Sequence, residues 1–529
     1  MATYVAPGVR LAELVASLSL ATDLGLGQPE EHVLRQTVIA TRLATAAGLP
    51  EEVRAAAFYV SLLGWVGCVA DSHELARWFD DDTQIRAATY GTDRAGLPMM
   101  RFLVGRLATD GSTLGGISAT GRFLAFGIRD VVNAVASHCE TTSQVADRLG
   151  LGEATTVALP QSLERWDGKG GPAGLSGERI EPVMRVVQIA NDAEVFWRGG
   201  GTRAVIEMLG TRRGREFDPT LVDVCRDHAA TIFAGLDTVD AWSTVIEGCA
   251  PLDRTMDEDE LLRALETFAD YADVKSPWFL GHSRAVAGLA AEAARRAHLP
   301  VSEVGLVERA GLVCRIGSIG VSSRTWDRPG PLSGIEWERV RTVPYLTERV
   351  LRRQGRLSEI GAIAGMFHER IDGSGYPRGL NGAAIPPAAR VLAAAEVYQA
   401  MREARPHRPA LEPAAARSGM LAEAVAGRLD AAAVDAVLAA AGHQVRRRPT
   451  LTAGLSPREV EILALLVRDL PNKQIAASLS ISARTVGSHI EHIYTKLGVS
   501  SRGAAAMYAL RLGIVDAVPL DEEPLATIG

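Results

Sequence analysis

The chain has 529 residues, too many for one compact domain, and its length predicts three or four domains of roughly 150 residues each. Hydrophobic residues make up 47% and charged residues 22%, which is typical of globular proteins and excludes a disordered or fibrous chain. The net charge of −7 excludes a general polyanion binder, so any contact with DNA must come from a local basic surface.

The cysteines and the apolar segments indicate the compartment. Five cysteines are scattered without a CxxC pair, which argues against a disulfide framework or a structural zinc site and favours a reducing cytoplasm. The longest uncharged run, residues 55–70, is shorter than the roughly 20 apolar residues of a membrane helix, so we expect a buried helix there. The N-terminus lacks the pattern of a signal peptide. We therefore expect a cytoplasmic protein without membrane contact.

One segment of the chain occurs twice. The sequence ERWDGKGGP at 164–172 recurs as ERIDGSGYP at 369–377, and Arg185 recurs as Arg390 at the same offset. Such self-similarity indicates a tandem duplication. We assign the first repeat to residues 1–250 and the second to 251–445, and a third domain, 446–529, begins with the basic stretch RRRP.

Both repeats are predicted to be helical. Apolar residues recur three or four positions apart, as in 282–298 and 346–357, and sustained alternation typical of strands is absent. The duplicated segment is rich in glycine, a residue that favours turns, and this predicts a loop of fixed conformation. The whole chain is therefore expected to be all-α.

The third domain begins with clear helix signals. Ser456 and Glu459 have the spacing of a capping box, and Pro457 stands at the first helical position, which predicts a helix to about residue 468. A short second helix, 472–479, follows with Asn472 as its predicted N-cap.

Two further helices complete the third domain. Ser482 is the predicted N-cap of a third helix, and a fourth follows residues 500–502 and ends at Gly513. The apolar positions at helical spacing predict their buried faces. They are Val486, Ile490, Ile493 and Leu497 in the third helix and Ala505, Tyr508, Ala509 and Leu512 in the fourth.

The motifs of this domain resemble those of the LuxR family of DNA-binding domains. They are LSPREVE at 455–461, NKxIA at 472–476, SARTV at 482–486, His489, KLGV at 496–499 and Arg502. The resemblance implies a four-helix unit whose third helix enters the major groove and whose fourth pairs two copies on a two-fold site. Double-stranded DNA and a homodimer are the implied partners.

The residues that would contact DNA fall into two classes. Cations and hydroxyls that neutralise and position phosphates are expected at Lys473, Arg484, Thr485, Lys496 and Arg502. Base edges would be read from the third helix, by the stretch Val486, Gly487, Ser488 and by Glu491 and His492. Gly487 departs from the lysine that the family often has there. The alternative is a packing domain with an ordinary solvated basic face.

The second repeat resembles the HD-GYP family, helical phosphohydrolases many of which hydrolyse cyclic dinucleotides. The loop HERIDGSGYPRGL at 368–380 is nearly the family signature, and the resemblance covers about 275–445, including RPHRP at 405–409. The first repeat is a more distant version of the same domain. The family's chemistry requires two or three metal ions held by imidazoles and carboxylates.

The metal ligands implied by this resemblance are largely replaced. In the second repeat two histidine ligands remain, His282 and His368. Cys314-Arg315 occupies the positions of the family's His-Asp pair, and Glu396 occupies the position of an aspartate ligand that comes later in the family sequence. Two further histidines are replaced by Val343 and Phe367. In the first repeat His32 and His138 fall at ligand positions, while the other positions hold Ser61-Leu62, Ser162-Leu163 and Asn191 beside Asp192.

Three interpretations of the body therefore remain open. The first is a catalytically degenerate sensor without a metal cofactor, whose emptied cleft binds a nucleotide or metabolite through Arg315, Arg370, Tyr376 and Arg378. The second is a phosphohydrolase tethered to DNA, with a metal remnant at His282, His368 and Glu396. The third is a scaffold that keeps Gly373, Gly375 and Tyr376 only for the turn. We favour the first, which makes the protein a transcriptional regulator and not an enzyme.

Overall fold

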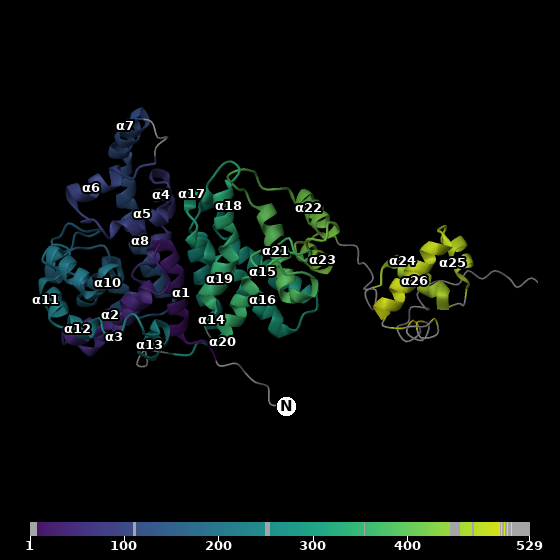
Figure 1. Ribbon diagram of the computed structural model, residues 1–529, viewed down its shortest axis with the longest axis horizontal. Helices are drawn as coiled ribbons and strands as arrows, with labels where there is room; N and C mark the ends of the chain where they lie inside the picture. Colours follow the sequence, from purple (N-terminus) through teal and green to yellow (C-terminus); the bar gives the residue numbers. More distant parts are fainter. Residues whose placement is uncertain are drawn as a thin grey trace, which may run out of the picture. The chain divides into compact units, whose positions relative to one another are not determined.

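The computed structural model describes residues 8–108, 113–248, 254–353, 355–444, 455–467 and 470–497, together with Val499, Arg502, Ala505 and Ala509. These residues form helices and no strand, which confirms the all-α prediction (Figure 1). The chain divides into two compact units, Met1–His443 and Gln444–Gly529. Both predicted repeats therefore lie in the first unit.

The first repeat consists of helices connected by turns and by the duplicated loop. Its elements are α1 Leu11–Leu26, α2 His32–Ala46, α3 Glu51–Leu63, η1 Val66–Val69, α4 Ser72–Trp78, α5 Asp82–Thr89, α6 Gly96–Val104, α7 Thr113–Arg122, η2 Phe123–Gly127, α8 Ile128–Arg148, α9 Glu153–Ala158, η3 Leu159–Gln161, η4 Gly177–Arg179, α10 Pro182–Arg212, α11 Pro219–Asp227, α12 Ala229–Ile232 and α13 Ala241–Gly248.

The second repeat follows the same order at several points. Its elements are α14 Glu258–Asp273, η5 Pro277–Phe279, α15 His282–Arg296, α16 Val301–Val313, η6 Ile316–Gly320, α17 Ser323–Trp326, α18 Gly334–Arg341, α19 Val343–Leu351, α20 Gly355–Ala364, η7 Gly382–Ala384, α21 Pro387–Arg402, α22 Pro413–Val425 and α23 Ala431–Ala440. The succession α14, α15, α16, η6 corresponds to α1, α2, α3, η1, and η7 with α21 corresponds to η4 with α10.

Each repeat caps its second helix with a buried aspartate from the first. Asp23 of α1 accepts a hydrogen bond from the Val33 amide at 3.0 Å, and Asp273 of α14 accepts from the Ser283 amide at 2.9 Å. Burial raises the pKa of Asp23 to about 7 and that of Asp273 to about 6. The same capping device at equivalent positions is what a duplication produces.

The duplicated loop has the fixed conformation that its glycines predict. Glu164 accepts backbone hydrogen bonds from residues 173 and 175, and Glu369 accepts them from residues 378 and 380 in the second copy. A Cβ on Gly170 or Gly375 would lie 2.5 Å or 2.3 Å from a backbone nitrogen, so no side chain fits at either position. In both copies, a buried carboxylate and a glycine that no other residue can replace therefore fix the conformation of the loop.

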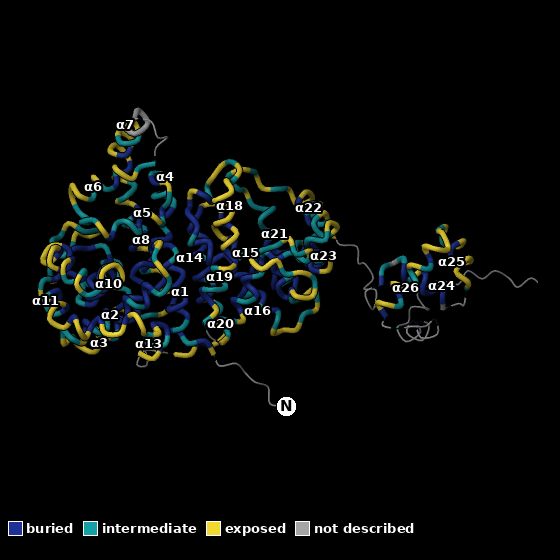
Figure 2. The backbone as a smooth tube through the Cα atoms, in the orientation of Figure 1, coloured by how far each residue is buried: buried dark blue, intermediate teal, exposed yellow. Residues whose placement is uncertain are grey.

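The core of the first unit is shared between the repeats. Nearly every residue of α1 is buried, and Leu24 on this helix packs against Gly320 of the second repeat. Figure 2 shows buried segments where α1 and α14 lie. The stretch Glu51–Val69 is long and apolar enough to cross a membrane by length and composition, with a mean hydropathy of 1.3, but 78% of its apolar window is buried inside the unit. It is a core helix, as the sequence predicts.

A buried charge cluster connects the two repeats. Lys275 and Asp82 are both fully buried, and Nζ of Lys275 lies 2.6 Å from a carboxylate oxygen of Asp82. Asp82 also accepts hydrogen bonds from the Ser322 hydroxyl and the Ser323 amide, both at 2.9 Å, and Arg86 lies 3.2 Å away. Because the lysine and both serines belong to the second repeat, the cluster holds the repeats against each other.

The second unit contains α24 Pro457–Val467, α25 Asn472–Ser478 and α26 Ala483–Leu497. The predicted capping box is confirmed, because the Ser456 amide donates to Glu459 at 2.6 Å and the Glu459 amide donates to the Ser456 hydroxyl at 3.2 Å. The predicted Asn472 cap is wrong: Pro471 occupies the N-cap, and Asn472 is the first helical residue. Most of the predicted fourth helix lies outside the described residues, but Ala505 and Ala509 are helical and fully buried.

Candidate functional sites

The centre of the second repeat brings together three residues from separate segments of the chain. His282 begins α15, Arg315 lies between α16 and η6, and Glu396 lies on α21. Oε1 of Glu396 is 3.7 Å from Nη1 of Arg315 and 4.0 Å from Nε2 of His282. Burial alone would raise the pKa of Glu396, but His368, His282 and Arg315 outweigh it and lower the pKa. The carboxylate therefore stays ionised among cationic and imidazole groups.

The ring of His282 is oriented by a carboxylate behind it. Its Nδ1 lies 2.7 Å from Oε2 of Glu403, and Arg405 donates to the same oxygen at 2.9 Å. Since a carboxylate accepts only, Nδ1 carries the proton and Nε2 faces the centre. Nε2 is buried and has no hydrogen-bond partner among the described residues.

Arg315 is fixed by aromatic faces. Its guanidinium lies 4.0 Å from the ring centroid of Phe279 and 5.4 Å from that of Trp326, and the residue is 6% exposed. Within the described part of the chain, its Nε and Nη2 have no hydrogen-bond partner. The centre thus holds a buried, stacked cation where sequence comparison placed a metal-bridging aspartate.

The duplicated loop supplies the outer part of this centre. The ring of His368 stacks on Tyr376 at 4.8 Å and on Phe367 at 4.2 Å, and burial lowers the pKa of His368 to about 4. Arg370 donates to the loop carbonyls of Phe367 and Glu369. Arg378 is exposed and pairs with Glu348 on α19, so of the four predicted ligand-binding residues it alone is engaged elsewhere.

The corresponding centre of the first repeat is closed by direct hydrogen bonds. Nε2 of His32 lies 3.2 Å from Oδ1 of Asn191, and the Tyr90 hydroxyl donates to that oxygen at 3.1 Å. Nδ1 of His32 lies 2.5 Å from Glu194. His138 does not join this centre, because its Nε2 contacts the carbonyl of Gly64 at 3.2 Å and burial lowers its pKa to about 4. The two predicted histidines are therefore separate.

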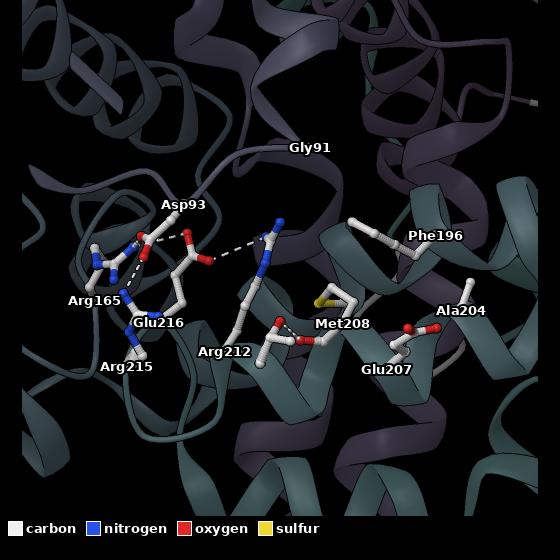
Figure 3. Close-up of a pocket in the computed structure, with 11 residues that line it drawn as sticks. Gly91, Asp93, Arg165, Phe196, Ala204, Glu207, Met208, Arg212, Arg215 and Glu216 are labelled. Atoms are coloured by element: carbon white, nitrogen blue, oxygen red, sulfur yellow. Dashed lines mark hydrogen bonds and ion pairs between the residues drawn. The ribbon is translucent and has the colours of Figure 1, made fainter. Parts of the chain in front are cut away.

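A cavity of about 420 Å³ lies in the first repeat, where the sequence analysis predicts no site. Figure 3 shows charged groups at one end, Arg212 in the middle and Phe196 with Met208 at the other end. The helix α10 changes direction at Gly200 and Gly201, where the dihedral angles are not helical, and lining residues come from both sides of this kink. The glycine run 199–201 was the signal that could have indicated it. The lining consists of Gly91, Asp93, Arg165, Phe196, Ala204, Glu207, Met208, Thr211, Arg212, Arg215 and Glu216.

The arginines that line this cavity are already paired. Arg165 lies 3.0 Å from Asp93 and 3.1 Å from Glu216, and Arg212 lies 3.2 Å from Glu216. Arg215 pairs with Asp93. The charged end of the cavity is therefore an internally neutralised network.

In the second unit, α26 presents an exposed polar face. The Ser482 hydroxyl accepts from the Thr485 amide at 3.1 Å, which confirms the predicted N-cap. Val486 is fully buried in the core with Ile493, so its side chain cannot face DNA, and we correct its assignment as a contact. The predicted contacts that are exposed are Lys473, Arg484, Thr485, Ser488, Glu491 and His492, and Gly487 is partly exposed.

Two predicted phosphate contacts are bonded inside the unit. Nζ of Lys496 lies 2.7 Å from Glu459, the capping-box carboxylate, and this contact lowers the glutamate pKa against the effect of burial. Arg502 donates to the carbonyls of Leu466 and Leu470 at 3.0 Å and 2.7 Å. Both side chains tie helices of the unit together, which the sequence motif alone did not reveal.

Comparisons with known proteins fit both parts of the chain. A model of the HD domain matches residues 266–433. The 3'3'-cGAMP-specific phosphodiesterase 3 of Vibrio cholerae is 30% identical over 412 residues, which cover 76% of this chain and 88% of that protein. The chain belongs to the HD-GYP family. A crystal structure of the Vibrio cholerae cyclic GMP-AMP-specific phosphodiesterase V-cGAP3, 26% identical, superposes on this HD-GYP protein with a TM-score of 0.58 and covers 83% of this chain and 99% of that one.

The C-terminal part of this HD-GYP protein matches a second family. The model described as bacterial regulatory proteins, luxR family, matches residues 453–509. The oxygen regulatory protein NreC of Staphylococcus aureus is 44% identical over 62 residues, which cover 12% of this chain and 29% of that protein. The LuxR and HD-GYP resemblances seen in the sequence are thus confirmed.

Proposed function

We propose that this HD-GYP protein is a sequence-specific DNA-binding transcriptional regulator. The observation that carries the proposal is the exposed face of α26, where Arg484, Thr485, Ser488 and Glu491 lie beside one another on a helix of the LuxR type. Arg484 and Lys473 supply cations for phosphates, and Ser488 and Glu491 supply polar groups for base edges.

We further propose that the body is a non-hydrolytic sensory and oligomerising module. A divalent ion held by His282 and Glu396 would lie beside the buried guanidinium of Arg315, which is 3.7 Å from the same carboxylate. At about 4 Å and an effective dielectric constant near 20, that repulsion is roughly 8 kcal/mol for a divalent ion. The residues present therefore do not fit the metal centre of the family, and no hydrolytic step is assigned to them.

The proposed partners are double-stranded DNA and a second copy of the chain. LuxR-type readers act on two-fold sites, so two copies must be held at a spacing of about one helical turn. A ligand in the body would then act by favouring one spacing over another. The buried thiols of Cys68, Cys139, Cys225 and Cys314, which form no disulfide, suit a reducing cytoplasm.

The test of DNA binding uses the full-length protein and a fluorescent duplex of random sequence. Lys473→Ala with Arg484→Ala should weaken binding and reduce the slope of log affinity against log salt by about 2, because two phosphate contacts are lost. Arg203→Ala, which removes an exposed arginine from α10, is the matched control and should change neither quantity. Equal binding by the double variant and the control would refute the assignment of α26.

Sequence preference is tested separately, by selection from a pool of random duplexes. Ser488→Ala and Glu491→Gln should each alter the selected sequence while leaving the salt slope unchanged, since neither contributes a cation. An unchanged selected sequence in both variants would contradict base reading by α26.

A second candidate is a phosphodiesterase tethered to DNA, favoured by the relatives named above. Metal content of the purified protein and hydrolysis of 3'3'-cGAMP with added manganese decide between the two. We expect no stoichiometric metal and no turnover. Bound metal together with turnover that is lost in His282→Ala would overturn the non-hydrolytic assignment.

A further inference from the structure

The polar groups at the centre of the second repeat converge without bonding directly. The distances from Glu396 to Arg315 and to His282, 3.7 and 4.0 Å, exceed those of hydrogen bonds. Among the described residues, His282 Nε2 and Arg315 Nε and Nη2 are buried without a hydrogen-bond partner. Buried polar groups are normally satisfied, so these three atoms indicate a bound group between them.

The first repeat shows that the scaffold can close this centre. There the equivalent His32 reaches Asn191 at 3.2 Å, and Tyr90 bonds the same amide oxygen. The open arrangement in the second repeat is therefore a property of its own residues, Glu396 and Arg315, and not a packing defect of the fold.

Arg315 offers the geometry that binds an oxyanion. Nε and Nη2 lie on one edge of the guanidinium, and that edge matches two oxygens of a phosphate or carboxylate. Phe279 and Trp326, which also contact each other, pack against the guanidinium and hold the side chain in place before a ligand arrives.

The neighbouring carboxylate is a hydrogen-bond acceptor. Glu396 is ionised, and Nε2 of His282 faces the same centre while Nδ1 is directed at Glu403. An oxyanion without a proton would be repelled by Glu396. A phosphate group that keeps a P–OH offers oxygens to the arginine and a proton to this carboxylate.

We propose that the centre of the second repeat binds a terminal phosphate group, either inorganic phosphate or a phosphomonoester. Two phosphate oxygens lie on the Nε and Nη2 edge of Arg315, and the P–OH donates to Glu396. Sulfate, and a phosphodiester such as a cyclic dinucleotide, carry no such proton at neutral pH and are disfavoured. The inference deepens the proposed sensory role of the body and rests on it.

The test is isothermal titration of the full-length protein with inorganic phosphate, GMP, sulfate and 3'3'-cGAMP. Phosphate or GMP should bind at least about tenfold more tightly than sulfate or the cyclic dinucleotide, since those two leave the carboxylate of Glu396 without a donor. Tighter binding of GMP identifies a nucleotide monoester as the ligand, and equal binding identifies phosphate itself. No heat of binding with either phosphate or GMP at millimolar concentration would overturn the proposal.

Two variants with matched controls locate the site. Arg315→Lys keeps the charge but removes the two-donor edge, and it should weaken phosphate binding about tenfold. Glu396→Gln can donate to sulfate, and it should reduce the preference for phosphate over sulfate by a similar factor. Arg296→Lys and Glu292→Gln make the same changes in a solvent-accessible pair at the C-terminal end of α15 and should alter neither quantity.

The outcomes remain distinct even if a variant is unstable. If Arg315→Lys fails to fold by circular dichroism, the anion preference of Glu396→Gln decides, and an unchanged preference overturns the proposal. Duplex binding is measured on the same samples. If the wild-type protein binds the duplex but not phosphate, this inference alone is refuted. If the wild-type protein does not bind the duplex, the proposed function is refuted.

Discussion

Replacing Lys275 with methionine should destabilise the body, because it leaves a buried carboxylate without its nearest cation. Nζ of Lys275 lies 2.6 Å from Asp82 and 3.3 Å from the Ser72 hydroxyl, and both charged side chains are fully buried. Removal of one partner of a buried pair costs about 3–5 kcal/mol. Arg86 still reaches Asp82 at 3.2 Å, so we expect the lower end of that range, about 3 kcal/mol.

Urea unfolding followed by tryptophan fluorescence measures this change in the full-length protein. All eight tryptophans lie between Trp65 and Trp337, so the signal reports the body and not the LuxR-type unit. Lys169→Met is the matched control, because Lys169 is exposed and is the only other lysine before Lys473. Asp82→Asn combined with Lys275→Met should recover part of the loss, since the uncompensated charge is removed.

A cost below about 1 kcal/mol for Lys275→Met, equal to that of the exposed control, would refute the reasoning. It would mean that the pair contributes no more than a surface ion pair.

Two more predictions concern a buried acid and a glycine. Since the folded pKa of Asp23 is about 7 and its usual value is 3.8, the folded state holds a proton that the unfolded state releases, and stability should fall as pH rises from about 4 to 7. Asp23→Asn should weaken this dependence, to which Asp273 with its raised pKa also contributes, and stabilise the body at pH 8 by up to about 4 kcal/mol, as measured by urea unfolding at pH 5 and 8; an unchanged pH profile would contradict the assignment. Gly487→Lys meets no atom within 4 Å of its Cβ and should steepen the salt slope of duplex binding by about 0.9, with Gly487→Ala as the control that leaves the slope unchanged. A lysine variant with the slope of the alanine variant would show that position 487 does not face the phosphates.

Local signals in the sequence predicted local structure well. The capping box at Ser456 and the N-cap at Ser482 depend on residues three positions apart, so the pattern contains all the information required. The duplicated loop was recognisable because its glycines and its glutamate are fixed by contacts within the loop itself.

Interactions between distant segments could not be predicted. Lys275 and Asp82 are 193 residues apart, and no local sequence pattern around either residue indicates that they form an ion pair. The spacing of the motif predicts Lys496 as a phosphate contact, but it could not show that this lysine pairs with Glu459 on another helix. Val486 is predicted both on the buried face of the third helix and among the DNA contacts, and the structure confirms only the burial.

The candidate centre was predicted in part. The replaced ligands identified Arg315, His282 and Glu396, because the family motif fixes their positions in sequence. The distances between them, the stacking of Arg315 on Phe279 and the unpaired nitrogen of His282 depend on how three helices pack, and required the structure.

The buried pair between Lys275 and Asp82 also bears on how such a chain can evolve by recombination. A gene fragment that encodes either repeat alone would expose an apolar face and leave one charge of this pair without its partner. Exchange of parts with other regulators is therefore expected at the junction between the body and the LuxR-type unit, and not between the repeats. The two repeats are therefore expected to be inherited together, and a substitution at Asp82 restricts which residues are tolerated at position 275.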